Sequence, residues 1–250
     1  MTYKSLTLVA ASLALLGACN AEKGSNAATT NTPLAVAPVA APNGGDWSTV
    51  TTATPEGGML MGNPAAKVKL IEYGSLTCPH CREFDETGVK PLVDNYVKKG
   101  LVSWEFRNFV RDPYDITATL VARCGGPSSF FGLMRSLYAD QENWVGKLQA
   151  IDPAKIQAMQ TMTPQAQFAA IADAAGFPAF AALRGVPRAK TAACLADVNA
   201  PTKLVQVNSD VVAQYPNFSG TPNFIINGKL DEKLAGWPSV EAKLREALGG

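Results

Sequence analysis

The chain has 250 residues, of which 47% are hydrophobic and 17% charged, and its formal net charge at pH 7 is +1. This composition supplies enough apolar side chains for a full-sized hydrophobic core. Because the chain carries almost no excess positive charge, it is not expected to bind polyanions, and nucleic acid is excluded as an expected partner.

The N-terminus has the pattern of an export signal. Lys4 precedes an apolar run from Leu6 to Leu16, which is too short for a stable transmembrane anchor and is typical of a secretory signal. Leu16-Gly17-Ala18-Cys19 resembles the bacterial lipobox, which implies a lipoprotein signal peptide at residues 1–18 and a lipid on Cys19. Under the alternative, ordinary cleavage a few residues later discards Cys19. We expect a periplasmic protein attached to a membrane through this lipid.

Residues 19–45 are expected to form a flexible tether. The segment is rich in Ala, Asn, Thr and Pro and has almost no bulky side chains. It therefore cannot bury enough surface to offset the entropy lost on ordering. The folded domain should begin near Asp46.

The motif Cys78-Pro79-His80-Cys81 is the strongest indication of chemistry in the chain. It follows the apolar run 68–73, a predicted strand, and a helix that restarts on Pro79 leaves Cys78 at the helix N-terminus. Unpaired N–H groups and the helix dipole favour an anion there, in this case the Cys78 thiolate. We therefore predict that Cys78 is the nucleophile and that Cys81, one turn deeper, is the resolving thiol.

The two residues between these cysteines should make the disulfide a stronger oxidant. Pro79 costs the helix nothing at its first position, and His80 can hydrogen-bond to the neighbouring sulfur or stabilise its charge. Half of a structural zinc site is the alternative, but the chain offers only the widely separated Cys124 and Cys194 as further ligands. We expect no metal and no dissociable cofactor.

The chain after the motif predicts further helices and one more strand. The helix that contains Cys81 should be kinked or interrupted at Gly88 and Pro91, and a strand is expected from Val102 to Phe109. A capping residue followed by proline, as at Asp112-Pro113, marks the start of a helix. The same pattern recurs at Asp152-Pro153 and Thr163-Pro164, and Gly176 should end a helix.

These signals divide the chain into an α/β domain and a helical insertion. No β-type alternation interrupts residues 112–199, which we expect to form the insertion between a first part at 46–111 and a second part at 200–250. Helices are expected from Pro201 to Gln214 and from Val240 to Leu248, after Trp237 and Pro238. Phe130, Phe131, Tyr138 and Trp144 could line a substrate groove, but core packing is the preferred interpretation.

Two segments carry a resemblance to a known family. Residues from Asp46 to about Phe84, with Gly62-Asn63-Pro64 and the Cys-Pro-His-Cys motif, resemble the DsbA family of thiol-disulfide oxidoreductases, as does Ser219 to Gly228. The resemblance implies an α/β, thioredoxin-like fold with an inserted all-helical subdomain. It also implies that Pro222 is a cis proline facing the active disulfide.

The resemblance also implies roles for further residues. Thr221, before the cis proline, would pair through its backbone with an extended substrate. Glu72 matches the family's buried carboxylate, which moves protons to and from the resolving thiol, and such burial raises the pKa of a carboxyl group. A solvated strand face remains the alternative for Glu72.

Cys124 and Cys194 remain after the other cysteines have been assigned. An exported compartment permits them to form a structural disulfide. Two separately buried free thiols are the alternative.

Together these features predict a tethered thiol-disulfide oxidoreductase that gives its disulfide to reduced exported proteins. The family resemblance implies that a DsbB-like membrane partner reoxidises it. Two rivals stay open. One is a reductase or isomerase kept as the dithiol, since threonine before the cis proline occurs in the isomerase-like branch. The other is a thioredoxin-like module that binds metal or peptides without turnover.

Overall fold

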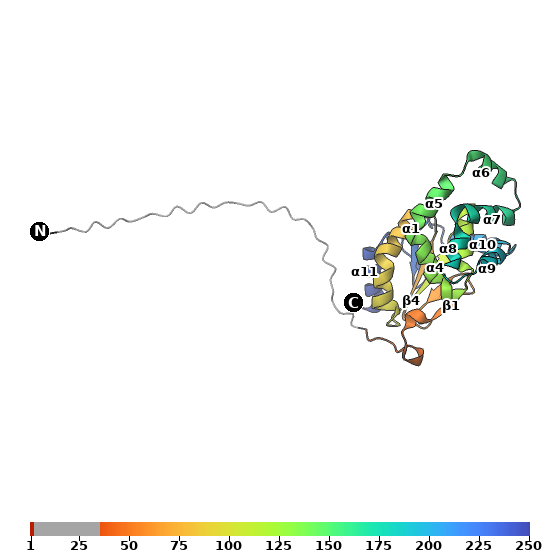
Figure 1. The fold of residues 1–250 in the computed structure, drawn as a ribbon. Coiled ribbons are helices and arrows are strands. Elements are labelled where there is room, and N and C mark those ends of the chain that lie inside the picture. Colours follow the sequence, from red (N-terminus) through yellow and green to blue (C-terminus); the bar gives the residue numbers. More distant parts are fainter. Residues whose placement is uncertain (3–35) are drawn as a thin grey trace. The chain divides into compact units, whose positions relative to one another are not determined.

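The computed structural model describes residues 1–2 and 36–250 (Figure 1). The predicted signal peptide, the lipid site Cys19 and most of the tether lie outside the described residues. The last part of the predicted tether contacts the domain, because the backbone N–H of Val39 donates to Lys99 O and the indole N–H of Trp47 donates to Val39 O. The packed part of the chain therefore begins before Asp46, the predicted boundary.

A mixed, six-stranded sheet organises the domain, with the strand order β1-β2-β4-β3-β5-β6. The strands are β1 (Thr51–Ala53), β2 (Met59–Met61), β3 (Val68–Gly74), β4 (Val102–Asn108), β5 (Asn223–Ile226) and β6 (Lys229–Leu230). The central strands β3 and β4 run parallel, from the pair Val68–Val102 to the pair Gly74–Asn108. Strand β5 pairs with β3 in the antiparallel direction. The β5–β6 hairpin turns at Asn227-Gly228, where both residues have positive φ.

Eleven α-helical segments accompany the sheet in residues 36–250. They are α1 (Pro79–Phe84), α2 (Lys90–Leu92), α3 (Pro113–Arg123), α4 (Pro127–Ala139), α5 (Gln141–Gln149), α6 (Pro153–Gln160), α7 (Pro164–Ala175), α8 (Phe177–Ala182), α9 (Arg188–Leu195), α10 (Ala200–Gln214) and α11 (Trp237–Leu248). The predicted interruption at Gly88 and Pro91 takes the form of π-helical turns at Asp85–Val89 and Val93–Val97.

The predicted caps begin the helices of the insertion. The Asp112 carboxylate accepts from the Asp115 backbone N–H at 2.9 Å, and Asp152 accepts from Ala154 in the same way at 2.8 Å. Gly176 ends α7 in the left-handed conformation, with φ 81°. The last helix begins earlier than predicted, at Trp237. The Ser239 hydroxyl accepts from the Gly236 N–H at 3.4 Å and donates to Gly236 O at 2.8 Å, and proline is tolerated at Pro238 in the first turn.

Helices cover both faces of the sheet. Leu70 and Phe224 belong to the main core with residues of α1, α4 and α11, whereas Tyr73 and Ile225 pack with Val207 and Val211 of α10. Figure 1 shows α11 beside the helix that starts with α1. The helices α7, α8 and α9 of the insertion lie on the other side of α4. The predicted α/β thioredoxin-like fold with an inserted helical subdomain is confirmed.

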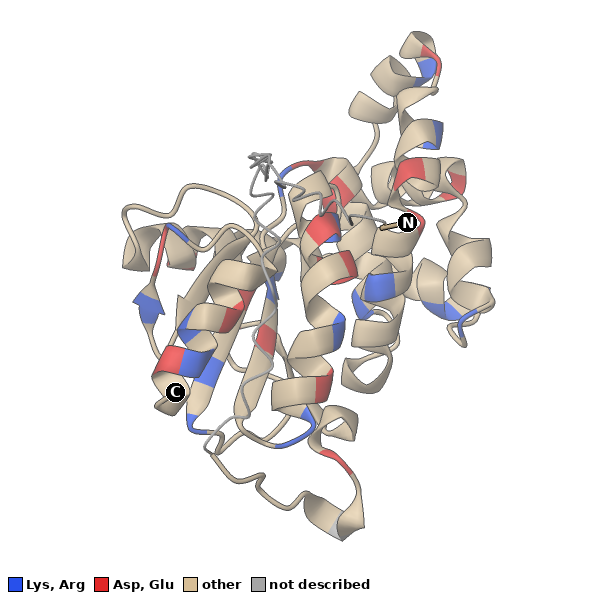
Figure 2. Ribbon diagram, turned by 90° about the vertical axis from the view of Figure 1, so that its left-hand side faces the viewer, with Lys and Arg blue, Asp and Glu red and all other residues tan. Residues whose placement is uncertain are grey.

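The core interpretation of the four aromatic residues is also confirmed. Phe130, Phe131, Tyr138 and Trp144 are all at most 5% exposed. Acidic and basic residues are interspersed along the surface helices, as Figure 2 shows. Within residues 36–250, no helix combines the length and the apolar character needed to cross a bilayer.

Candidate active site

The redox motif lies where strand β3 ends and helix α1 begins. Cys78 has extended backbone angles (φ −87°, ψ 121°) and is the N-cap of α1, and Pro79 occupies the first helical position. The two cysteines are free thiols in the structure, and both are buried, with exposures of 3% for Cys78 and 0% for Cys81. The sequence therefore places both sulfurs in one helical turn at the end of the central strand.

The Cys78 thiol is strongly acidified. Its pKa is lowered to about 5 by a hydrogen bond with the Cys81 thiol, and further by Thr221 and by the backbone N–H groups of Cys81 and His80, although burial opposes the change. Burial raises the pKa of Cys81 well above its usual value, and the charge on Cys78 raises it further. At neutral pH the pair therefore holds one thiolate, on Cys78.

The second part of the domain brings Thr221 and Pro222 to the cysteines. The Thr221–Pro222 peptide bond is cis, as the resemblance implies. The Cys78 thiol donates to the Thr221 carbonyl oxygen at 3.2 Å, across 143 positions of the sequence. The loop that leads into β5 thus places a backbone carbonyl next to the nucleophilic sulfur.

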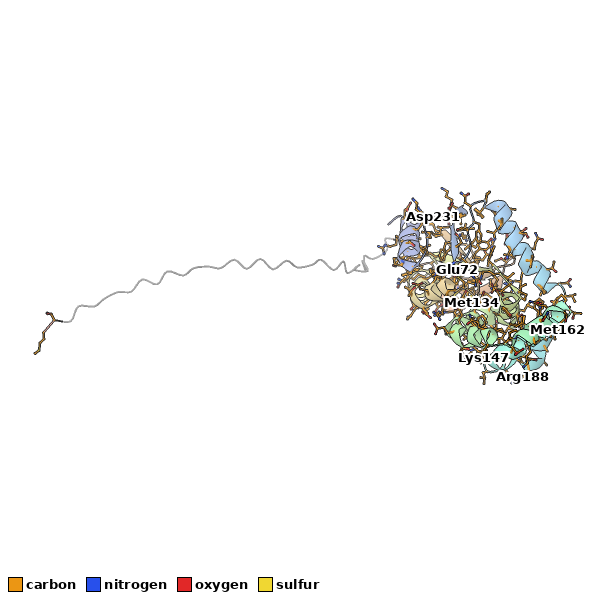
Figure 3. The ribbon with its side chains drawn as sticks, turned by 90° about the horizontal axis from the view of Figure 1, so that it is seen from above. Glu72, Met134, Lys147, Met162, Arg188 and Asp231 are labelled. Atoms are coloured by element: carbon orange, nitrogen blue, oxygen red, sulfur yellow. A yellow bond between two sulfur atoms is a disulfide. The ribbon has the colours of Figure 1, made fainter. Side chains whose placement is uncertain are left out.

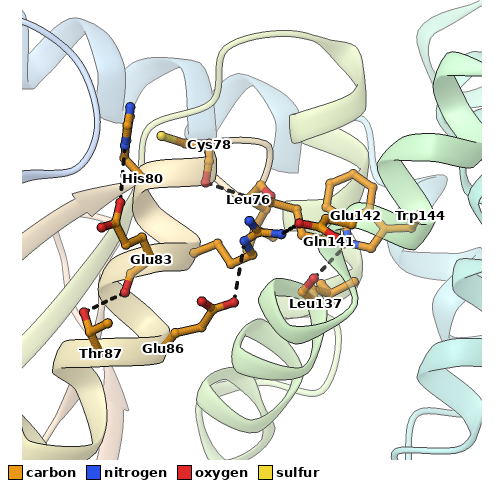
Figure 4. A network of polar contacts seen from close by, with 11 residues as sticks. Leu76, Cys78, His80, Glu83, Glu86, Thr87, Leu137, Gln141, Glu142 and Trp144 are labelled. Carbon is orange, nitrogen blue, oxygen red and sulfur yellow. Dashed lines mark hydrogen bonds and ion pairs between the residues drawn. The ribbon is translucent and has the colours of Figure 1, made fainter.

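The His80 side chain is not placed as expected. Its ring is exposed, and Nδ1 lies 3.5 Å from Glu83 Oε2, at the surface of α1 (Figure 4). The backbone N–H of His80, and not its imidazole, is the group that contributes to the low pKa of Cys78. The structure thus pairs the imidazole with the exposed carboxylate one turn on, and the hydrogen bond that His80 was expected to offer the sulfur comes from its backbone.

Glu72 belongs to β3 and lies inside the domain (Figure 3), with 1% exposure. The indole N–H of Trp104 donates to its Oε2 at 3.0 Å. Burial raises the Glu72 pKa well above its ordinary value, and the nearby charge of Asp85 raises it further. The solvated alternative for Glu72 is therefore wrong. A negative charge on Glu72 would raise the pKa of Cys81 further.

Burial of this carboxyl group predicts a pH-dependent stability. Glu72 keeps its proton in the folded state at pH values where the unfolded chain, with a pKa of about 4.3, has lost it. Stability therefore falls as the pH rises above that value towards the folded pKa. We expect Glu72→Gln to remove this part of the fall, so that the free energy of unfolding of the variant rises relative to the wild type as the pH increases above about 4.3.

Urea denaturation at several pH values measures this effect, and Glu83→Gln, on the exposed surface of α1, is the matched control. Asp85, whose pKa burial raises to about 6, leaves a residual slope of the same sign in both variants. An advantage of Glu72→Gln that stays constant with pH would show that Glu72 is ionised in the folded state.

The loop before Cys78 is held by a buried carboxylate that the sequence did not mark. Asp115 of α3 is 0% exposed and accepts from the Ser75 hydroxyl at 2.6 Å and from the Leu76 N–H at 2.9 Å. Arg111 donates to the Ser75 hydroxyl oxygen and to Thr77 Oγ1. Burial raises the pKa of Asp115 to about 7. Asp115 looked like an ordinary first-turn acid in the sequence, because its partners lie 39 and 40 positions away.

Cys124 and Cys194 form a disulfide that joins the C-terminal end of α3 to α9, with Cα atoms 5.8 Å apart. The alternative of two free thiols is therefore wrong. Within residues 36–250, no group of three or more His, Cys, Asp or Glu side chains is arranged to hold a metal ion.

Comparison with known proteins identifies the family to which this chain belongs. The family model described as thioredoxin matches residues 54–246. A crystal structure of a protein-disulfide isomerase from Novosphingobium aromaticivorans is 34% identical, with a TM-score of 0.72, and the match covers 82% of this chain and 100% of that one. The chain belongs to the thioredoxin family.

Other similar proteins agree with the assignment to the thioredoxin family. The crystal structure of Wolbachia pipientis alpha-DsbA1 has the same fold, with a TM-score of 0.61 at 20% identity over 79% of this chain and 94% of that one. A Rickettsia prowazekii protein assigned as a protein-disulfide oxidoreductase is 27% identical over 74% of this chain. The match spans 60% of the length of that Rickettsia protein.

Proposed function

We propose that this chain is an exported protein-disulfide oxidase that introduces disulfide bonds through Cys78 and Cys81. The observation that carries the proposal is the separation between the two thiol pKa values, with Cys78 at about 5 and Cys81 well above its usual range. Stabilising the Cys78 thiolate stabilises the reduced form, and a pair whose reduced form is stabilised is a strong oxidant.

The proposed reaction consists of two exchanges. A substrate thiolate attacks Cys78 Sγ in the disulfide form, the Cys78–Cys81 bond breaks, and Cys81 leaves with the electron pair. We propose that Glu72, whose pKa burial raises well above its ordinary value, gives it a proton. A second substrate thiolate then attacks the substrate sulfur of the mixed disulfide, and Cys78 leaves as its stabilised thiolate. The substrate gains one disulfide, and the enzyme pair is reduced by two electrons.

The proposed substrates are reduced exported proteins that contain cysteine pairs. An extended segment of such a protein can pair with the backbone at Thr221, whose carbonyl oxygen lies 3.2 Å from Cys78 Sγ. Turnover requires reoxidation of the pair, for which we propose a DsbB-like membrane partner.

We also propose that the chain is periplasmic and held at a membrane by a lipid on Cys19. Val39 contacts Lys99, just before β4, and parallel strands start at the same edge of a sheet. Cys78 follows the other end of β3, about 20 Å away at 3.3 Å per residue. The chain therefore enters the domain far from Cys78, so an N-terminal anchor leaves the sulfur accessible. Metabolic labelling with a fatty acid tests the anchor, and an unlabelled mature chain would disprove it.

A disulfide isomerase is the second candidate. The 34% identical relative from Novosphingobium aromaticivorans bears that name, and the same Cys78 thiolate would start isomerisation by attacking a substrate disulfide. The two candidates differ in the resting state of the pair, which is a disulfide in an oxidase and a dithiol in an isomerase.

Alkylation of the thiols in intact cells separates the two candidates. A reagent that adds mass to free thiols is applied before lysis, and the mature protein is analysed on a gel. An oxidase leaves the Cys78–Cys81 pair unmodified, and the purified disulfide form then oxidises a reduced model protein stoichiometrically. A pair that is mostly alkylated in cells would contradict the oxidase proposal and favour the isomerase.

A further inference from the structure

Gln141 is a buried polar residue at the start of α5, and it lies against the loop that carries Cys78. The side chain is 4% exposed. Its Nε2 donates to Leu76 O at 2.7 Å and to Cys78 O at 3.0 Å, contacts that lie between α5 and the start of α1 in Figure 4. Both hydrogens of the amide nitrogen are thus used. The flipped amide would place its oxygen against two carbonyl oxygens, so the hydrogen bonds also fix its orientation.

The two carbonyl groups bracket the nucleophilic residue. Each peptide unit is planar, so a carbonyl held in place fixes the orientation of a whole unit. The Leu76 carbonyl belongs to the unit before Thr77, and the Cys78 carbonyl belongs to the unit before Pro79. With both carbonyls bound to one side chain, the backbone of Cys78 cannot rotate without losing a buried hydrogen bond.

The position of the Cys78 backbone decides where its sulfur lies. The contacts that favour its thiolate come from the N–H groups of His80 and Cys81 at the start of α1 and from the Thr221 side chain. Hydrogen bonds weaken steeply with poor distance or angle. A small rotation of Cys78 therefore costs several of the contacts that favour its thiolate.

The inserted helices hold the rest of the loop as well. Tyr138 of α4 donates to Ser75 O at 3.1 Å, and Asp115 of α3 accepts from the Leu76 N–H at 2.9 Å. Both side chains are at most 1% exposed. Of these three side chains, Gln141 is the one that contacts Cys78.

We propose that Gln141 is a positioning residue for thiol-disulfide exchange: its amide ties the helical insertion to Leu76 and Cys78 and thereby fixes the nucleophilic sulfur at the start of α1. The inference rests on the proposed role of Cys78 as the nucleophile. It holds for an oxidase and an isomerase alike, because both use the same thiolate. Among the side chains by which the insertion holds the loop, Gln141 thus reaches the nucleophilic residue itself.

The test is an ultraviolet titration of the reduced full-length protein with Gln141→Met, which keeps the length of the side chain and removes both donors. We expect the midpoint of the first thiolate transition to rise by about one pH unit, a tenfold change in the acid dissociation constant. Gln149→Met, the same substitution at the exposed end of α5, is the control and should titrate like the wild type.

A purely structural role would lower the melting temperature and leave this midpoint unchanged. A midpoint for folded Gln141→Met that equals the wild-type value would overturn the inference. If Gln141→Met does not fold, Gln141→Asn decides in the same way, since its shorter amide cannot reach both carbonyl oxygens. A shifted midpoint, combined with a Cys78–Cys81 pair that is found reduced in cells, would support the role of Gln141 and contradict the oxidase function. Failure of the Gln141 proposal is therefore distinguishable from failure of the oxidase proposal.

Discussion

Cys78→Ser should abolish thiol-disulfide exchange, whereas Cys81→Ser should leave a protein that captures its substrates covalently. A serine hydroxyl forms no disulfide, so without Cys78 the mixed disulfide cannot form at all. In Cys81→Ser the Cys78 thiolate still reacts with substrate disulfides, but no second thiol is present to release the product. Turnover should fall to the uncatalysed background in both variants.

Non-reducing gels after incubation with a model protein that contains a disulfide, and a turnover assay with a reduced model protein, check this prediction. Cys81→Ser should show additional bands of higher mass that disappear when reductant is added, and Cys78→Ser should show none. The disulfide between Cys124 and Cys194 is intact in both variants and serves as an internal control for folding. Turnover above background in either variant would refute the assigned roles.

Removing the disulfide between α3 and α9 should lower the free energy of unfolding more than any other substitution considered above. The bond closes a loop of 70 residues, and the chain-entropy model then gives a stabilisation of about 4 kcal/mol. We expect Cys124→Ala/Cys194→Ala to lower the free energy of unfolding by that amount. For a domain of this size the melting temperature should fall by roughly 8–16 °C.

This measurement needs a background without redox exchange. Urea denaturation is therefore compared in proteins that also carry Cys78→Ser and Cys81→Ser, with circular dichroism as the signal. Reductant added to the parent, which keeps Cys124 and Cys194, should produce a similar loss. A loss below about 1 kcal/mol would mean that native strain or residual structure in the unfolded chain cancels the entropic gain.

The sequence reveals those features of the site that depend on residues close together in the chain. Cys78, Pro79 and Cys81 lie in one turn, and the strand before them and the proline within them determine where the helix begins. The cis peptide at Pro222 could be predicted only through the family resemblance, because a single X-Pro pair is also common in ordinary turns.

The part that escaped prediction depends on contacts between distant elements. Asp115 and Gln141 reach Leu76 across 39 and 65 positions, and nothing in their local sequence distinguishes them from surface residues of a helix. The burial of Glu72 depends likewise on Trp104 of the neighbouring strand. The short hairpin of β1 and β2 was also missed, because three-residue strands carry too little alternation to be recognised.

The acidity of one thiol is the basis of the proposed chemistry, and an ultraviolet titration of the reduced protein measures it directly. The thiolate absorbs more strongly than the thiol, Cys124 and Cys194 are bonded and do not titrate, and Cys81 ionises only at a much higher pH. We expect a first transition with a midpoint at about pH 5 that Cys78→Ser lacks. A first transition near the value of a free cysteine, about 8.5, would contradict the account.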